Sequence, residues 1–326
     1  MKQLTSKIII LFWALVGSYG LGVTLYTILQ YTIGERFIAV AWLNNGAHLL
    51  WAGAIVLLVP SIIFRKQGII ALMILPTLAF TVNYLPMYVP HEIDPPPNSQ
   101  QLSVLTYNIN LAPPDITSIA NDIRNINADI VAIQELTFDT IDMLEVMLSD
   151  LYPYRALHPV KGFHGQGILS KYPIINDEFW SIYLGHQRAE IDIKGEIITV
   201  YNLHPVHHLA GGFNVSLRTE EIDFALNKAK YDHTPILLMG DFNMTDQSAD
   251  YQRITSTYQD SYKQVGYGMG TTFPAHIPFL PSLARIDYVF YSKEFTALDA
   301  DVLRSTGGSD HRPLVVTLAL DKADNK

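Results

Sequence analysis

Three long uncharged stretches near the N-terminus constrain the fold of this 326-residue chain more than any other feature. No Asp, Glu, Lys or Arg occurs in residues 8–34, 37–64 or 67–90. Each stretch is longer than the about 20 residues that an α-helix needs to cross a lipid bilayer. Residues 1–90 are therefore predicted to form a membrane region with three transmembrane helices, which we expect to remain as an uncleaved anchor.

The few charged residues beside these stretches predict their orientation. Two lysines precede the first stretch, and Arg65 and Lys66 separate the second from the third. The connection between the first two has only Arg36 beside Glu35. The positive-inside rule then places the N-terminus in the cytoplasm. After three crossings the rest of the chain would be extracytoplasmic, so we expect an integral protein of a plasma or inner membrane.

The composition changes after residue 90. The remaining 236 residues contain 17 basic and 30 acidic side chains, a net charge of −13. Residues 91–100 include three consecutive prolines and are predicted to be an extended linker. The chain has no cysteine, which excludes disulfides, thiolate–zinc sites and cysteine nucleophiles. We expect residues 101–326 to form a domain that depends on its hydrophobic core.

Short apolar runs alternate with turns throughout this domain. The runs at 129–136 and 235–241 lack polar alternation, which is typical of strands buried on both faces. Helices are predicted at 115–127, with Asp115 as the N-cap, and at 138–149 and 216–230. Further strands are expected at 102–108, 165–171, 188–193, 196–204, 284–292 and 313–320. Many strands with few helices predict two packed sheets flanked by helices, an α/β sandwich.

Polar side chains stand at the ends of several of these runs, and one stands within a run. Each alone has a structural explanation as a turn former, a cap or a surface ion pair. A charge at the end of a buried strand is costly unless it is paired or binds a metal, however, and strand ends of layered sheets commonly meet at one edge. The residues that could form such a site are Asn108, Asn110, Glu135, Asn202, His204, Asp241, Asn243, Asp287, Ser309, Asp310 and His311.

The same segments carry a family resemblance. In chain order, YNIN, IVAIQEL, NLHP, GDFN, RIDYVF and GSDHRP resemble the signature motifs of the endonuclease/exonuclease/phosphatase family, which includes DNase I. The resemblance covers about residues 101–320. It implies a four-layered α/β sandwich, which here follows the three-helix transmembrane region. It also implies hydrolysis of a phosphate ester by metal-assisted attack of water.

The resemblance implies a metal site and a group that activates water. Glu135 resembles the principal ligand of Mg²⁺ or Mn²⁺, with Asp310 and Asn108 near the metal; these oxygen ligands suit such an ion. Asp241 resembles the carboxylate that orients or deprotonates the attacking water. Asn243 resembles its hydrogen-bonding neighbour.

Two histidines complete the implied set. His311 resembles the histidine beside the scissile phosphate, and Asp287 the acid that accepts its other ring proton and fixes the tautomer. His204 resembles a second histidine, which contacts the phosphate and assists the leaving group. In DNase I-like members that histidine pairs with a glutamate from an earlier strand, but residues 154–168 contain no glutamate.

Three more residues are possible substrate contacts. Asn110 stands where many abasic-site endonucleases have an aspartate, which weakens the metal shell or shifts it onto Glu135. His164 lies in GFHGQGIL, and His207 follows NLHP in a loop that could equally be solvated.

The charge of the domain bears on the substrate. Binding a long nucleic acid requires many Lys and Arg side chains, whereas this domain is acidic. A tether to the membrane raises the effective concentration of surface phosphoesters. We therefore expect a phosphodiesterase acting on lipid-linked or small phosphoesters. Alternatives are a tethered extracytoplasmic nuclease, a phosphomonoesterase or an inactive binding domain. No protein partner is expected.

Overall fold

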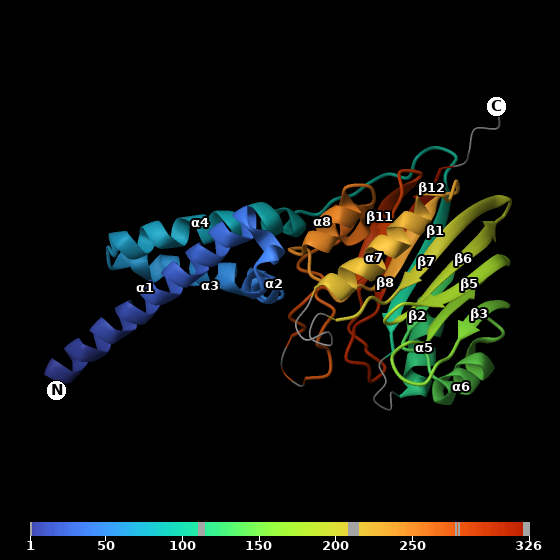
Figure 1. Ribbon diagram of the computed structural model, residues 1–326, viewed down its shortest axis with the longest axis horizontal. Helices are drawn as coiled ribbons and strands as arrows, with labels where there is room; N and C mark the ends of the chain where they lie inside the picture. The colour runs from blue at the N-terminus through green and yellow to red at the C-terminus, as the bar shows by residue number, and fades with distance from the viewer. Residues whose placement is uncertain (1, 110–114, 208–214, 278, 280, 322–326) are drawn as a thin grey trace. The chain divides into compact units, whose positions relative to one another are not determined.

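The computed structural model of the protein divides into two compact units (Figure 1). It describes residues 2–109, 115–207, 215–277, 279 and 281–321. One unit is Met1–Val89 with Gln247–Ala249, and the other is Pro90–Asp246 with Asp250–Lys326.

The first unit is helical. Its elements are α1 (Lys2–Thr32), the 3₁₀ turn η1 (Gly34–Arg36), α2 (Ile38–Asn44), α3 (Ala47–Ile63), α4 (Gln67–Tyr84) and η2 (Leu85–Tyr88). Two segments, Gln3–Thr32 and Gln67–Tyr88, are long and apolar enough to cross a membrane. Helices α2 and α3 meet at a 74° bend and add a third crossing only if the bent pair is one span. The bend falls at Asn-Asn-Gly, residues that favour helix ends over helix interiors.

Hydrogen bonds join the helices of this unit inside their apolar surroundings. The Tyr26 hydroxyl of α1 donates to Asn44 Oδ1 of α2 at 2.9 Å. Trp51 Nε1 of α3 donates to Thr27 Oγ1 of α1, also at 2.9 Å. All four residues are buried. Buried polar groups in such a bundle are satisfied by neighbouring helices.

The second unit contains two six-stranded sheets. The first has the order β11-β12-β1-β2-β4-β3, with β1 (Gln100–Asn108), β2 (Ile130–Gln134), β3 (Tyr154–His158), β4 (Gln166–Ser170), β11 (Phe295–Val302) and β12 (Leu314–Leu320). The second has the order β5-β6-β7-β8-β10-β9, with β5 (Ile174–Ser181), β6 (Gly185–Ile193), β7 (Glu196–Leu203), β8 (Ile236–Asp241), β9 (Gln259–Asp260) and β10 (Asp287–Tyr291). Each sheet has one parallel pair, β1–β2 and β7–β8, and its other neighbours are antiparallel.

Two helices cover the outer face of the first sheet. They are α5 (Ile116–Ile126) and α6 (Phe138–Leu148). Ile119 of α5 and Leu144 of α6 belong to one buried cluster with Ile133 of β2. Asp115 caps α5 by accepting the backbone N–H of Ser118, as the sequence predicts.

Helices α7 (Ser216–Ala229) and α8 (Ala249–Thr255) pack on the second sheet, and the short α9 (Ser261–Val265) follows β9. Ile222 and Ile254 share a buried cluster with Leu238 of β8. The layers are therefore helix, sheet, sheet and helix, which confirms the α/β sandwich (Figure 1).

A buried amide pair joins the two sheets. Gln134 Nε2, at the end of β2, donates to Asn202 Oδ1 of β7 at 2.7 Å. Asn202 Nδ2 in turn donates to the carbonyls of Ile133 and Gly167 in the first sheet, at 2.9 and 3.1 Å. Because both amides are completely buried, these hydrogen bonds fix the sheets relative to each other next to the strand ends.

Candidate active site

The candidate site lies at the edge where the two parallel strand pairs end. Asn108 and Asp241 are the last residues of β1 and β8, and Glu135 and His204 directly follow β2 and β7. Strand β10 runs antiparallel to β8 and places Asp287 opposite Asp241. Segment Ser309–His311 precedes β12, which runs antiparallel to β1. The site residues that the sequence indicated and that this edge brings together are Asn108, Glu135, His204, Asp241, Asn243, Asp287, Asp310 and His311.

Unusual backbone conformations shape this edge. Glu135 has φ of +62° and Asn243 has φ of +50°, in the left-handed region that is uncommon for residues other than glycine. Gly240 has φ of +144°, and a Cβ there would overlap with the Leu203 carbonyl oxygen of the neighbouring strand. Strain of this kind is found where a side chain must point in one direction at a functional site.

Asn108 connects the carboxylates of the two sheets. Its Nδ2 donates to Glu135 Oε1 and to Asp241 Oδ2, each at 3.0 Å. Asn108 is 1% exposed and Glu135 is 9% exposed. Two carboxylates that share one amide in a buried place concentrate negative charge, which favours binding of a cation.

The GDFN turn fixes one oxygen of Asp241 and leaves the other facing the site. The Asn243 backbone N–H donates to Asp241 Oδ1 at 2.9 Å, and Asn243 Nδ2 donates to the Pro205 carbonyl at 3.1 Å. Arg218 of α7, which is paired with Asp250, donates to the Asn243 carbonyl at 2.9 Å. Asp241 Oδ2 lies 3.6 Å from His204 Nε2 and 3.6 Å from His311 Nε2.

Burial raises the pKa of Asp241 from 3.8 to about 6. The positive charge of His311 opposes this rise, and the negative charge of Asp287 adds to it. A carboxyl group with this pKa accepts a proton near neutral pH more readily than an ordinary aspartate does.

His311 is oriented by an acid on its far side. Its Nδ1 lies 2.9 Å from Asp287 Oδ2, so the ring donates there and directs Nε2 toward Asp241 and toward Asp310 Oδ1, which is 3.9 Å away. The His311 backbone N–H donates to Ser309 Oγ, which donates to the Asn108 carbonyl. Burial alone would lower the pKa of His311, but Asp287 and Asp241 outweigh it and raise the pKa from 6.5 to about 10.

His204 lies in a different environment. Its Nδ1 is 3.2 Å from the Phe163 carbonyl oxygen, so a backbone carbonyl takes the place of the glutamate that pairs with this histidine in DNase I-like members. Burial lowers the pKa of His204, although the negative charge of Asp241 opposes this. His204 is therefore neutral at pH 7, with Nδ1–H on the carbonyl and the Nε2 lone pair facing the carboxylates.

The charge of His311 gives a testable dependence of stability on pH. Its folded-state pKa, about 10, lies above the ordinary value of 6.5. The imidazolium therefore stabilises the fold fully below about pH 6.5, and this contribution is lost as the pH rises through about 10. In EDTA, the melting temperature of the wild type should exceed that of His311→Gln at about pH 7, and this difference should disappear at about pH 10.5. A pH-independent difference would contradict the assignment.

The remaining predicted residues have fewer contacts with the site. Asn110 lies outside the described residues. His164 lies in the loop before β4, and within the described part of the chain no hydrogen bond or ion pair joins its side chain to the site. His207 is half-buried, three residues after His204. The Asp310 side chain is 24% exposed, and its Oδ1 lies 3.9 Å from His311 Nε2.

One group of potential ligands lies close together, and it differs from the predicted set of Asn108, Glu135 and Asp310. The ligand atoms of Asp241, Asp287 and His311 all lie within 4.8 Å of one another. Asp287 and His311 are already hydrogen-bonded to each other, although Asp287 Oδ1 is buried without a hydrogen-bond partner among the described residues. The carboxylates of Asp241 and Asp287 therefore offer oxygen atoms, the ligand type that a divalent cation prefers, whereas protonated His311 offers none.

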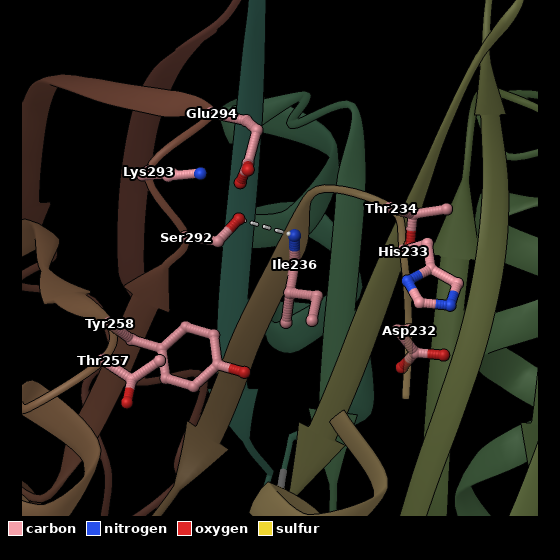
Figure 2. Close-up of a pocket in the computed structure, with 9 residues that line it drawn as sticks. All are labelled: Asp232, His233, Thr234, Ile236, Thr257, Tyr258, Ser292, Lys293 and Glu294. Carbon is pink, nitrogen blue, oxygen red and sulfur yellow. Dashed lines mark hydrogen bonds between the residues drawn. The ribbon is translucent and has the colours of Figure 1, made fainter. Parts of the chain in front are cut away.

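A pocket of about 310 Å³ lies elsewhere (Figure 2). It is lined by Ile236, the first residue of β8, whereas Asp241 is the last residue of that strand. Ser292, which follows β10, accepts the Ile236 backbone N–H at 2.8 Å (Figure 2). The pocket is therefore at the opposite end of β8 from the buried carboxylates and histidines.

Sequence reasoning missed three buried residues behind the site. They are His186 at the start of β6 and Arg218 and Glu221 on α7. His186 Nδ1 accepts the backbone N–H of His204 at 3.3 Å. Arg218 and Glu221 lie on the same face of α7 as the buried Ile222, so the helical period could have identified both as charges on an apolar face.

The fold is that of a family of hydrolases that act on phosphate esters. The chain belongs to the Endonuclease/Exonuclease/phosphatase family, whose family model matches residues 105–311. Members of the family typically depend on a divalent metal. No curated protein matches the chain.

Solved structures agree on the fold. An endonuclease/exonuclease/phosphatase family protein from Bacteroides thetaiotaomicron is 21% identical with a TM-score of 0.57, over 69% of this chain and 100% of that one. A mannosyl-6-phosphatase from the same organism is 22% identical with a TM-score of 0.56, over 67% and 99%. Truncated TDP2 from Caenorhabditis elegans is 19% identical with a TM-score of 0.54, over 67% and 97%.

Proposed function

We propose that this chain is a membrane-anchored phosphodiesterase that uses Mg²⁺ or Mn²⁺ to hydrolyse lipid-linked or small phosphoesters. The observation that carries the proposal is the pair Asp241 and His311, buried 3.6 Å apart with their pKa values raised to about 6 and about 10. At neutral pH this leaves a carboxylate that can accept a proton beside an imidazolium that can donate one. Environments that separate two pKa values in this way define an acid and a base.

Each side chain then has one task. Asp241 orients the attacking water and accepts its proton, since its Oδ2 faces the site while Asn243 occupies its Oδ1. His311, oriented by Asp287, donates through Nε2 to the phosphate oxygens and stabilises the charge that develops on them. His204 presents the lone pair of Nε2 and so accepts a hydrogen bond from a hydroxyl of the substrate or from water.

Glu135 would bind the divalent ion as the principal ligand, with Asn108 and Asp310 nearby. Glu135 and Asn108 are buried and joined by a 3.0 Å hydrogen bond, which restricts the carboxylate to one orientation. When bound, the ion supplies Lewis-acid activation and neutralises phosphate charge.

Two properties of the chain support the substrate class. Residues 91–326 carry a net charge of −13, which disfavours a long nucleic acid. Two segments of the first unit, or three if the bent pair is one span, are long and apolar enough for a membrane anchor. An anchored domain encounters membrane phosphoesters at high local concentration. The alternatives are a tethered nuclease and a phosphomonoesterase, and a comparison of substrates distinguishes them.

We also propose that the catalytic domain is extracytoplasmic and the N-terminus cytoplasmic. The basic residues Arg65 and Lys66 between α3 and α4 support this orientation. A protease added to intact cells with a permeabilised outer envelope is expected to cleave within residues 101–326. Protection of that region until the inner membrane is opened would reverse the orientation.

The activity is tested with the purified full chain in detergent. We expect it to hydrolyse bis-p-nitrophenyl phosphate with Mg²⁺ or Mn²⁺ and to prefer that diester to p-nitrophenyl phosphate. Assays of phospholipids, sphingomyelin, inositol phosphates, DNA and RNA under the same conditions identify the class of substrate. Preference for DNA or RNA would favour the nuclease, and preference for the monoester the phosphatase. Failure to hydrolyse any of them would contradict the proposed function.

A further inference from the structure

A second histidine–carboxylate pair lies directly behind His204. His186 is 1% exposed and Glu221 is 0% exposed, and His186 Nε2 lies 3.2 Å from Glu221 Oε1. His186 Nδ1 accepts the backbone N–H of His204 at 3.3 Å. Since Nδ1 accepts, the His186 ring carries its proton on Nε2, which lies close to the Glu221 carboxylate without the alignment of a hydrogen bond. The direction of the hydrogen bond from the His204 backbone to His186 is therefore fixed.

Glu221 joins two segments that end at the site. Its Oε1 accepts the backbone N–H groups of Tyr183 and Leu184, before β6, at 2.8 and 2.6 Å. Its Oε2 accepts the backbone N–H of Val206, two residues after His204, at 2.7 Å. Burial opposes ionisation of Glu221, but His186 and these backbone donors outweigh it and lower its pKa. A buried carboxylate with this many donors is a fixed point of the structure.

The same stretch also positions the partner of the His204 ring. Gly185, which precedes His186, contacts the backbone of His164 so closely that a Cβ would overlap with its carbonyl oxygen. The neighbouring residue Phe163 supplies the carbonyl that accepts from His204 Nδ1. Gly185 and His186 therefore adjoin both the segment that accepts from the His204 ring and the His204 backbone N–H.

We propose that His186 and Glu221 are positioning residues that act through His204, a role that rests on the proposed function. In DNase I-like members a glutamate paired with the imidazole orients this histidine. Here His186 and Glu221 would orient His204 through its backbone N–H instead. The ring hydrogen bond of His204 goes to a carbonyl and not to a carboxylate. Outer hydrogen bonds of this kind typically affect turnover without contacting the substrate.

The test compares substitutions that remove or keep the acceptor for the His204 N–H. His186→Leu removes it, and we expect kcat for bis-p-nitrophenyl phosphate to fall by about tenfold with KM within about twofold. His186→Asn places Oδ1 near the position of Nδ1, and we expect it to recover most of the loss. The matched control is His233→Leu, a histidine in the pocket at the opposite end of β8 (Figure 2), with unchanged kcat. Equal kcat in His186→Leu and the wild type would overturn the proposal.

A double-mutant cycle separates positioning from general destabilisation. If His186 acts through His204, His186→Leu should have no further effect on kcat in a His204→Ala background. A further loss of about tenfold in that background would show an independent structural role and overturn the proposal. If His186→Leu does not fold, Glu221→Gln replaces it. The glutamine amide would place an N–H donor against a backbone N–H, so kcat should again fall in the wild-type background and stay unchanged in the His204→Ala background.

Hydrogen exchange gives a readout that does not depend on activity. In the full chain in detergent, amide exchange in peptides covering 203–206 should be faster in His186→Leu than in the wild type and close to wild type in His186→Asn. If this pattern appears but the wild type hydrolyses no phosphoester, the positioning holds and the proposed function fails. If exchange does not respond to His186→Leu, the positioning itself is wrong.

Discussion

Replacing Asp241 with asparagine is expected to lower kcat for bis-p-nitrophenyl phosphate by about 10²-fold or more, the usual contribution of a general acid–base group. Asparagine has the same shape, and its Oδ1 can still accept the Asn243 backbone N–H, so the turn is preserved. The substitution removes the charge at Oδ2, which faces His204 and His311 at 3.6 Å. Steady-state rates with saturating Mg²⁺ measure the effect.

Stability measurements distinguish this loss from misfolding. Burial raises the pKa of Asp241 to about 6, so the ionised carboxylate disfavours the fold above that pH. The Asp241→Asn variant loses this unfavourable buried charge but also the hydrogen bond from Asn108 to Oδ2, so it should still unfold cooperatively near the wild-type melting temperature at pH 8 while losing its activity. Asp232→Asn, at the opposite end of β8, is the matched control and should keep normal turnover. Near-normal rates in Asp241→Asn would remove Asp241 from the reaction.

The buried strands were predictable because burial on both faces leaves an unbroken apolar run. β2 and β8 are completely buried and lie within the predicted runs. β5 was missed because all of its residues are exposed or half-exposed, and it includes the acidic pair Asp177 and Glu178. Because β5 is an exposed edge strand, its sequence lacks the apolar–polar alternation that would distinguish it from a loop.

The candidate site was predictable only where its residues end or precede a buried apolar run. Asp241 and His311 stand out in the sequence because a charged side chain that ends or precedes a buried run needs a partner. Glu221 lies in the stretch TEEID, where its charge suggests a solvated helix face, although its position beside Ile222 on the helical period indicates the buried face that the packing of α7 shows. The Phe163 carbonyl could not be predicted, because a backbone acceptor leaves no residue type to recognise.

Chelation is expected to have the largest effect of all. Glu135, Asp241 and Asp310 place negative charge where an anionic phosphate must enter, and like charges a few ångström apart repel strongly in a buried site. His311 supplies one positive charge, which Asp287 already balances. We therefore expect that a divalent cation is needed both to admit the substrate and to stabilise the charge that develops during attack of water.

In EDTA, turnover of bis-p-nitrophenyl phosphate should fall to the background rate, and added Mg²⁺ or Mn²⁺ should restore it. Glu135→Gln should raise the Mg²⁺ concentration for half-maximal activity by about tenfold or more, because it weakens a ligand without removing the Asn108 contact. Binding of the ion to the folded state should also raise the melting temperature of the wild type. Full activity in EDTA would exclude a metal-assisted reaction. An unchanged Mg²⁺ requirement in Glu135→Gln would instead remove Glu135 as the principal ligand, because a residue that binds the ion cannot lose its charge without a change in affinity.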